Sequence, residues 1–132
     1  MRRLVLSLAA LALTSVPAVA QVFRAENRVA VTPAPGGFEI SDGAGYGARG
    51  MWCGAADYAQ SVLGARGTDR LYVARGRSAG LGARGPVLFT LDPTGLVPRS
   101  FLIVGTSLGM PGATLTVAHA YQFCTDAKVI DR

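Results

Sequence analysis

The sequence predicts an α+β fold: a small single domain with a three- to five-stranded, mainly antiparallel sheet, packed by one main helix and closed by one disulfide. Three observations lead to this class. Short apolar runs separated by Gly- and Pro-rich turns are typical of antiparallel strands, and they lack the regular strand–helix alternation of a parallel sheet. The segment Met51–Leu63 has clear helical periodicity. The chain contains two cysteines, Cys53 and Cys124, which can pair.

Residues 1–20 have the three parts of a secretory signal peptide. Arg2 and Arg3 are basic, Leu4–Val16 carries no charge, and small residues precede the expected cleavage point after Ala20. The apolar run is shorter than the ~20 residues of a membrane-spanning helix. We therefore expect a secreted or periplasmic protein, with no membrane span after cleavage and a single exported α+β domain at residues 21–132.

The charge of the mature chain is mildly positive. The formal net charge of +5 falls to +3 when Arg2 and Arg3 are removed, because all 8 acidic residues follow Ala20. The sequence contains no block of like charges and no basic stripe of the kind that binds nucleic acid. We therefore expect no nucleic-acid partner.

The N-terminal half of the mature chain gives two short strands and the main helix. A strand is expected at Arg28–Val31, a turn at Thr32–Gly37 because of its Pro and Gly residues, and a strand at Phe38–Ile40. Ser41–Gly50 is expected to be a glycine-rich loop. In Met51–Leu63 the apolar residues recur at helical spacing and define one buried face.

The C-terminal half is expected to supply further strands. Arg70–Arg75 and Pro86–Leu91 have strand composition and are joined by the flexible loop Gly76–Gly85. Phe101–Val104 is a continuous apolar run of strand length. Ala113–Cys124 fits the helical and the strand template equally well, and the Pro-Gly pair before it favours the helix.

Residues 45–50, GYGARG, form a literal G-x-G-x-x-G directly before the helix. A dinucleotide-binding loop also requires an acidic residue at the end of the following strand, about 20 residues on. Asp69 precedes that strand, Arg75 ends it, and Trp52 adds bulk near the place where a pyrophosphate would approach. We therefore expect no nucleotide and no other cofactor.

The two cysteines predict a Cys53–Cys124 disulfide, because an exported domain matures in an oxidising compartment. Closing a loop of about 70 residues is worth roughly 4 kcal/mol in the chain-entropy model. Trp52, next to Cys53, is expected to pack in the core against this bond. A single histidine and two distant cysteines lack the spacing of metal ligands, so we expect no metal site.

The segment WCGAADYAQSVLG places Cys53 near the start of a helix, and a His-Ala-aromatic step follows at His119. Together they resemble the papain-like superfamily in its small bacterial forms, the transglutaminase-like and NlpC/P60-type domains. The resemblance implies a cysteine hydrolase or transferase with Cys53 as nucleophile, His119 as base and Asp131 or Asp126 as the orienting carboxylate. A disulfide between Cys53 and Cys124 would remove this nucleophile.

We therefore expect a non-catalytic accessory or binding protein of the cell envelope, with the cysteine hydrolase or transferase as the alternative. Loops on a rigid scaffold commonly carry binding, so Ser41–Gly50 and Gly76–Gly85 are the expected contact surface. The expected partner is a protein or an anionic envelope component, and the chain is expected to be a monomer. The candidate binding residues on or beside these loops are Tyr46, Arg49, Arg75, Arg77 and Arg84.

Overall fold

The computed structural model describes residues 21–77 and 85–130. The signal peptide predicted at residues 1–20, Arg84 and Asp131 lie outside the described residues. The elements, in chain order, are β1 (Phe23–Arg24), β2 (Ala30–Ala34), β3 (Gly37–Ile40), α1 (Gly47–Ser61), β4 (Arg70–Arg75), β5 (Val87–Thr90), α2 (Val104–Ser107), β6 (Thr114–Thr116), α3 (Val117–Gln122) and α4 (Thr125–Ile130).

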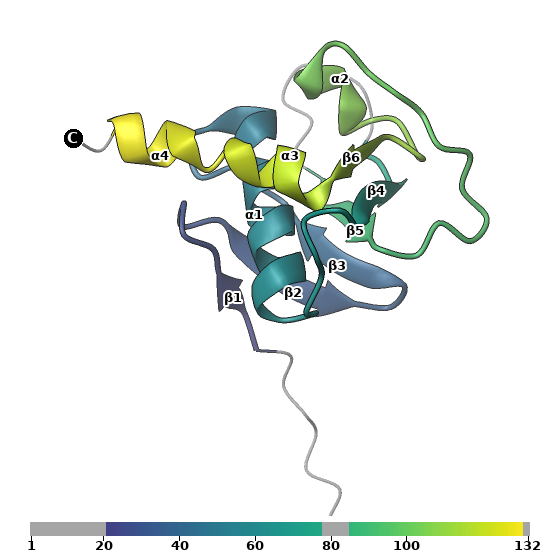
Figure 1. Cartoon of the computed structure of the whole chain (residues 1–132), viewed down its shortest axis with the longest axis horizontal. Coiled ribbons are helices and arrows are strands. Elements are labelled where there is room, and N and C mark those ends of the chain that lie inside the picture. Colours follow the sequence, from purple (N-terminus) through teal and green to yellow (C-terminus); the bar gives the residue numbers. More distant parts are fainter. Residues whose placement is uncertain (1–20, 78–84, 131–132) are drawn as a thin grey trace, which may run out of the picture.

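The strands form one sheet in the order β1-β2-β3-β5-β4-β6, and every neighbouring pair is antiparallel. Helix α1 lies against one face of this sheet, and α3 and α4 pass beside the N-terminal part of α1 (Figure 1). The structure confirms the predicted α+β class, the mainly antiparallel sheet and the single main helix. The described sheet has more strands than expected because β1 and β6 are very short strands at its two edges.

The hairpin of β2 and β3 turns at Pro35 and Gly36, where Gly36 has a φ of 83°. Pro before a left-handed Gly is the signature of a type II turn. Strand β2 therefore continues through residues that the sequence had assigned to a turn at Thr32–Gly37. Pro33 is tolerated inside β2 because the short β1 pairs only with Ala30 and Val31, so its missing N–H breaks no ladder on that side.

Helix α1 begins one turn earlier than the predicted Met51–Leu63 and ends slightly before it. Its start is packed tightly: the N–H of Tyr46 donates to the carbonyl of Gly43 at 3.0 Å. A Cβ on Gly50 would lie 2.3 Å from the same Gly43 oxygen. These glycines allow backbone to approach backbone, so part of the expected Ser41–Gly50 loop is helical.

The core lies between α1 and the sheet. The paired residues Phe38, Phe89 and Val73 face the helix from three adjacent strands. Trp52 is fully buried, as expected, with its ring centroid 5.1 Å from that of Phe89. Its indole Nε1 donates to the Ser107 hydroxyl at 2.9 Å, so its one polar atom is satisfied inside the core.

The expected strand at Phe101–Val104 is wrong. Phe101 stacks on Trp52 with 5.6 Å between ring centroids, but Leu102 and Ile103 are exposed and α2 begins at Val104. The strand β6 lies at the edge of the sheet, next to β4. Among the described residues, Arg99 forms an isolated bridge with Ala113, just before β6, and Phe101–Val104 pairs with no strand. An apolar run without a neighbouring strand cannot join the sheet, whatever its propensity.

The ambiguous segment Ala113–Cys124 contains both structures. It runs as β6 along β4 and then becomes α3, so the strand template is right for its beginning and the helical template for its end. Thr116 makes the switch: its side-chain oxygen accepts the N–H of His119 at 3.2 Å, which caps the first turn of α3.

The predicted disulfide is present. It joins Cys53 in α1 to Cys124 in the turn between α3 and α4, with 5.0 Å between the two Cα atoms. Both cysteines are buried. The bond fixes the C-terminal helices to the middle of α1 (Gly47–Ser61), because the structure begins this helix one turn before the predicted start.

Candidate functional site

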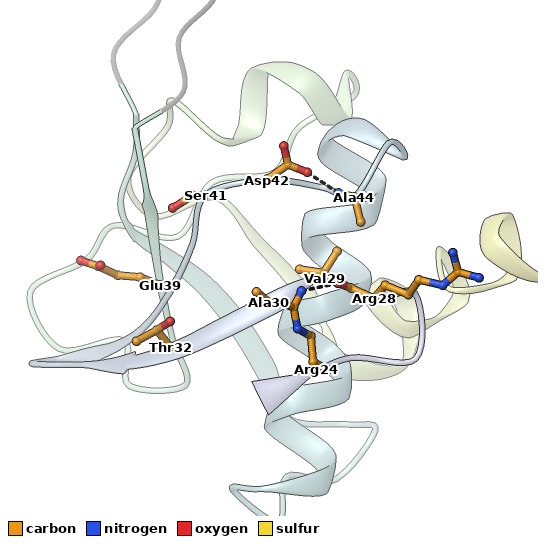
Figure 2. A pocket seen from close by; sticks show the side chains of 9 residues that line it. All are labelled: Arg24, Arg28, Val29, Ala30, Thr32, Glu39, Ser41, Asp42 and Ala44. Carbon is orange, nitrogen blue, oxygen red and sulfur yellow. Dashed lines mark hydrogen bonds between the residues drawn. The ribbon is translucent and has the colours of Figure 1, made fainter. Parts of the chain in front are cut away.

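A groove of about 430 Å³ lies on the N-terminal side of the sheet, next to the loop that leads into α1 (Figure 2). Strands β1, β2 and β3 and the loop after β3 form it. It is lined by Arg24, Arg28, Val29, Ala30, Thr32, Glu39, Ser41, Asp42 and Ala44.

The register of the strands explains the groove. Side chains alternate between the two faces of a strand, so Val31 and Phe38 face the core while Ala30, Thr32 and Glu39 face outward. Arg24 pairs with Ala30, and Thr32 pairs with Glu39. The middle strand therefore presents small side chains and its two neighbours present long ones, which leaves a trough along β2.

The loop after β3 forms one rim of the groove. The Asp42 carboxylate accepts the N–H of Ala44 at 2.5 Å, and Ala44 has a φ of 54° (Figure 2). An Asx turn of this kind stabilises a left-handed conformation that an alanine rarely adopts. The loop is thus held by the side chain of Asp42 together with the buried contact of Gly43 with the start of α1.

The charges around the groove differ in how they are satisfied. Glu39 forms an ion pair with Arg75, at 2.5 Å between Arg75 Nη2 and Glu39 Oε1. Among the described residues, Arg24 donates to a neutral group, the carbonyl of Arg28, at 3.4 Å. The side chain of Arg28 points away from Ser41 and Asp42 (Figure 2). Within the described residues, neither Arg24 nor Asp42 has an ion-pair partner.

A second hollow of about 420 Å³ adjoins the groove and shares Ser41 and Asp42 with it. Its other lining residues are Gly43, Gly45, Gly47 and Arg77. Arg77 is held in place because its backbone N–H donates to the Leu108 carbonyl at 2.9 Å and its guanidinium contacts Met51 Sδ at 3.1 Å. The structure therefore brings Arg77, the second residue of the predicted loop Gly76–Gly85, against the predicted loop Ser41–Gly50.

The other predicted binding residues have different positions. Tyr46 precedes α1 and is half-buried. Arg49 lines neither hollow: its Nε and Nη2 donate to the two carboxylate oxygens of Asp126 at 2.7 and 3.0 Å, and its guanidinium lies over Phe123. The hydrogen bond from Arg49 lowers the pKa of the Asp126 carboxyl. Arg75 lies at the edge of the groove through its ion pair with Glu39.

Sequence reasoning missed the strand residues of the groove: Arg24, Thr32 and Glu39. A signal was present, because residues 30, 32 and 34 of β2 are all small and share one face. This pattern is visible only if the strand extends through Pro33. The prolines of the segment predict a turn there. The long neighbours could be identified only from the sheet order.

Of the residues of the cysteine-hydrolase alternative, the structure describes Cys53, His119 and Asp126, while Asp131 lies outside the described residues. Cys53 is fully buried and bonded to Cys124, so a Cys53 thiolate would exist only in the reduced chain. His119 is exposed on α3, with its ring 5.9 Å from that of Phe123. Both carboxylate oxygens of Asp126 bind Arg49. Across residues 21–77 and 85–130, no group of three or more His, Cys, Asp or Glu side chains is placed to hold a metal ion.

Comparison of the chain with protein-family models, with curated proteins and with solved structures gives no match. Evidence on function therefore comes from the chain's own geometry. In the described part of the chain, none of the helices combines the length and the apolar character needed to cross a membrane.

Proposed function

We propose that the protein is an exported, non-catalytic accessory or binding domain of the cell envelope, which takes its ligand in the two hollows that meet at Ser41 and Asp42. The observation that carries the proposal is this pair of adjoining hollows. They are built from a sheet edge and a loop that a carboxylate side chain holds in place, which is a common design for a binding surface.

The charges and the scaffold support this proposal. Arginines line both hollows, Arg24 and Arg28 in the groove and Arg77 in the second hollow, which suits an anionic group on an envelope component or a protein. The disulfide suits an oxidising compartment. We also propose a monomer, because β1 and β6 are too short to offer a long edge for pairing between sheets.

The cysteine hydrolase or transferase, with Cys53 and His119, stays a prediction that applies to a reduced form. The two functions differ in a simple measurement, the intact mass of the exported, non-reduced protein with and without a thiol-alkylating reagent. The binding-domain proposal expects a chain that starts at Gln21, takes up no alkyl group when denatured and takes up two after reduction. Rapid alkylation of Cys53 in the native, unreduced protein would overturn it in favour of the enzyme.

Binding is tested with the isotope-labelled mature protein and soluble fragments of purified bacterial cell wall, followed by amide chemical shifts. The proposal expects shifts concentrated at residues 30–32 and 41–47, with the turn at Arg66–Asp69 as an internal control. Shifts absent at every concentration with cell-wall fragments, peptides and inorganic phosphate alike would contradict a binding role for the two hollows.

A further inference from the structure

The groove of Figure 2 has opposite charges on its two sides, and both charges lack an ionic partner in the described chain. Arg24 on β1 uses one of its N–H groups on a neutral carbonyl at 3.4 Å. Asp42, after β3, accepts one backbone N–H. The other acid of the groove, Glu39, is already paired with Arg75. Arg24 and Asp42 are thus the cation and the anion of this groove that a ligand can pair with, while the side chain of Arg28 points away from Ser41 and Asp42.

Small side chains, two of them with hydroxyl groups, line the groove between these charges. Ala30 and Thr32 form its floor, and the Ser41 hydroxyl lies at its edge. Figure 2 shows the Arg24 side chain lying towards Ala30, across the trough from Asp42 and Ser41. Hydroxyl groups at Thr32 and Ser41 can donate to or accept from the amides of a ligand that lies across the strands.

The strand register sets the length of a ligand that reaches both charges. Arg24 pairs with Ala30, and continuing the β2–β3 register places Ser41 on the other side of Ala30. Two strand spacings, about 9–10 Å, separate the backbones of Arg24 and Ser41, and the Arg24 side chain extends into this gap towards Ala30, so this distance is the upper limit for the ligand. An extended peptide covers roughly 3.3–3.6 Å per residue, so about three residues span this distance.

We infer that the groove binds a short peptide with free termini, about two to three residues long, with its carboxylate on Arg24 and its ammonium group on Asp42. This inference rests on the proposed binding function and names its ligand class. A polyanion fits less well, because the carboxylates of Asp42 and Glu39 would repel its far end. The groove volume, about 430 Å³, lies in the range of small-ligand sites.

The test uses the mature, oxidised protein and trialanine, followed by amide chemical shifts. Two blocked peptides, N-acetyl-trialanine and trialanine amide, each lack one terminal charge. We expect trialanine to shift residues 30–32, 41 and 42, and either blocked peptide to bind about tenfold more weakly, because each loses a charge-assisted hydrogen bond.

Two variants assign the two ends. Arg24→Gln should weaken trialanine about tenfold and leave trialanine amide unchanged, while Asp42→Asn should weaken trialanine and leave the N-acetyl peptide unchanged. Asn keeps the acceptor for Ala44, so the loop is retained. Arg99→Gln and Asp92→Asn are the matched controls: neither residue lines either of the two hollows, and the Asp92 carboxylate accepts the N–H of Thr94 as Asp42 accepts that of Ala44.

The outcomes separate this inference from the proposed function. Equal binding of free and blocked peptides, or equal effects of Arg24→Gln and Arg99→Gln, would overturn the peptide assignment. If inorganic phosphate or cell-wall glycan shifts residues 30–42 and trialanine does not, the inference fails and the binding function stands. If no probe shifts these residues, both fail.

Discussion

Among single residues, the buried Trp52–Ser107 pair shows how the core accepts a polar atom. Ser107 accepts the indole N–H at 2.9 Å and donates to the Val104 carbonyl at 2.5 Å, and its side chain has no exposed surface. In the described part of the chain, no buried side-chain nitrogen or oxygen lacks a hydrogen-bond partner. The pair fixes α2 against α1.

Replacing Ser107 by Ala should lower the free energy of unfolding by about 1–3 kcal/mol, because the indole N–H remains buried without an acceptor. Urea unfolding followed by circular dichroism measures the loss. In the background Trp52→Phe, which has no N–H to satisfy, the same Ser107→Ala change should cost less. Equal costs in both backgrounds would show that the hydrogen bond contributes nothing specific.

Gly54 is a second residue whose identity is set by packing, because the structure has no room for a Cβ atom there. A Cβ at this position would lie 2.6 Å from Val29 Cγ1, so α1 packs directly onto the chain before β2. Gly54→Ala should destabilise the protein by about 1–3 kcal/mol through overpacking, and Val29→Ala should recover part of this loss. Gly105→Ala, where a Cβ meets nothing within 4 Å, is the control and should be neutral or stabilising. A similar loss for both would rule out the packing explanation.

At the scale of elements, the C-terminal helices are attached to the body of the domain at several points. The disulfide holds the end of α3 to α1, and Arg49 of α1 pairs with Asp126 of α4. Lys128 of α4 reaches Glu26 in the turn between β1 and β2, with 3.2 Å between Nζ and Oε1. The exposed ion pairs are each worth at most about 1 kcal/mol, so the covalent link dominates.

Cys124→Ser should therefore lower the free energy of unfolding by about 2–5 kcal/mol and leave Cys53 as a free thiol. Urea unfolding of wild type, the single variant and Cys53→Ser/Cys124→Ser measures this, and the two variants should lose similar amounts. The cysteine-enzyme alternative predicts the opposite: stability unchanged by Cys124→Ser. Thiol titration of the denatured variant confirms that Cys53 is free.

For the whole molecule, Glu26 connects the turn between β1 and β2 to the C-terminal helices α3 and α4. Its carboxylate accepts the Tyr121 hydroxyl of α3 and pairs with Lys128, while its own N–H donates to Asp57 of α1 at 2.8 Å. The hydrogen bond to Glu26, helped by partial burial and the nearby negative charge, raises the pKa of Tyr121 to about 12. The phenol is thus held in its protonated form.

This raised pKa predicts a loss of stability at high pH. The unfolded tyrosine titrates near 10, so the stabilising contribution is complete below pH 10 and is lost as the pH rises towards about 12. The urea midpoint should fall more steeply from pH 10 to 12 in the wild type than in Tyr121→Phe. In a pH titration followed by absorbance of the ionised phenol near 295 nm, the variant should lack the tyrosine that ionises at about pH 12 in the wild type. Parallel pH profiles would contradict a bond between Tyr121 and Glu26.

The sequence by itself determined the features that depend on local periodicity and composition. The apolar face of α1, the bounds of β4 at Arg70–Arg75 and the pairing of Cys53 with Cys124 were all predicted, because helical spacing, strand composition and cysteine number do not depend on distant neighbours. The α+β class follows from the same local signals.

Only the tertiary structure decided the features that need a partner from elsewhere in the chain. Phe101–Val104 has strand composition but no strand beside it, and Pro33 stays in β2 because β1 is short. The groove exists because sheet order places small residues of β2 between Arg24 and Glu39. Strand neighbours are long-range contacts, and local propensity carries no information about which side chains they bring together.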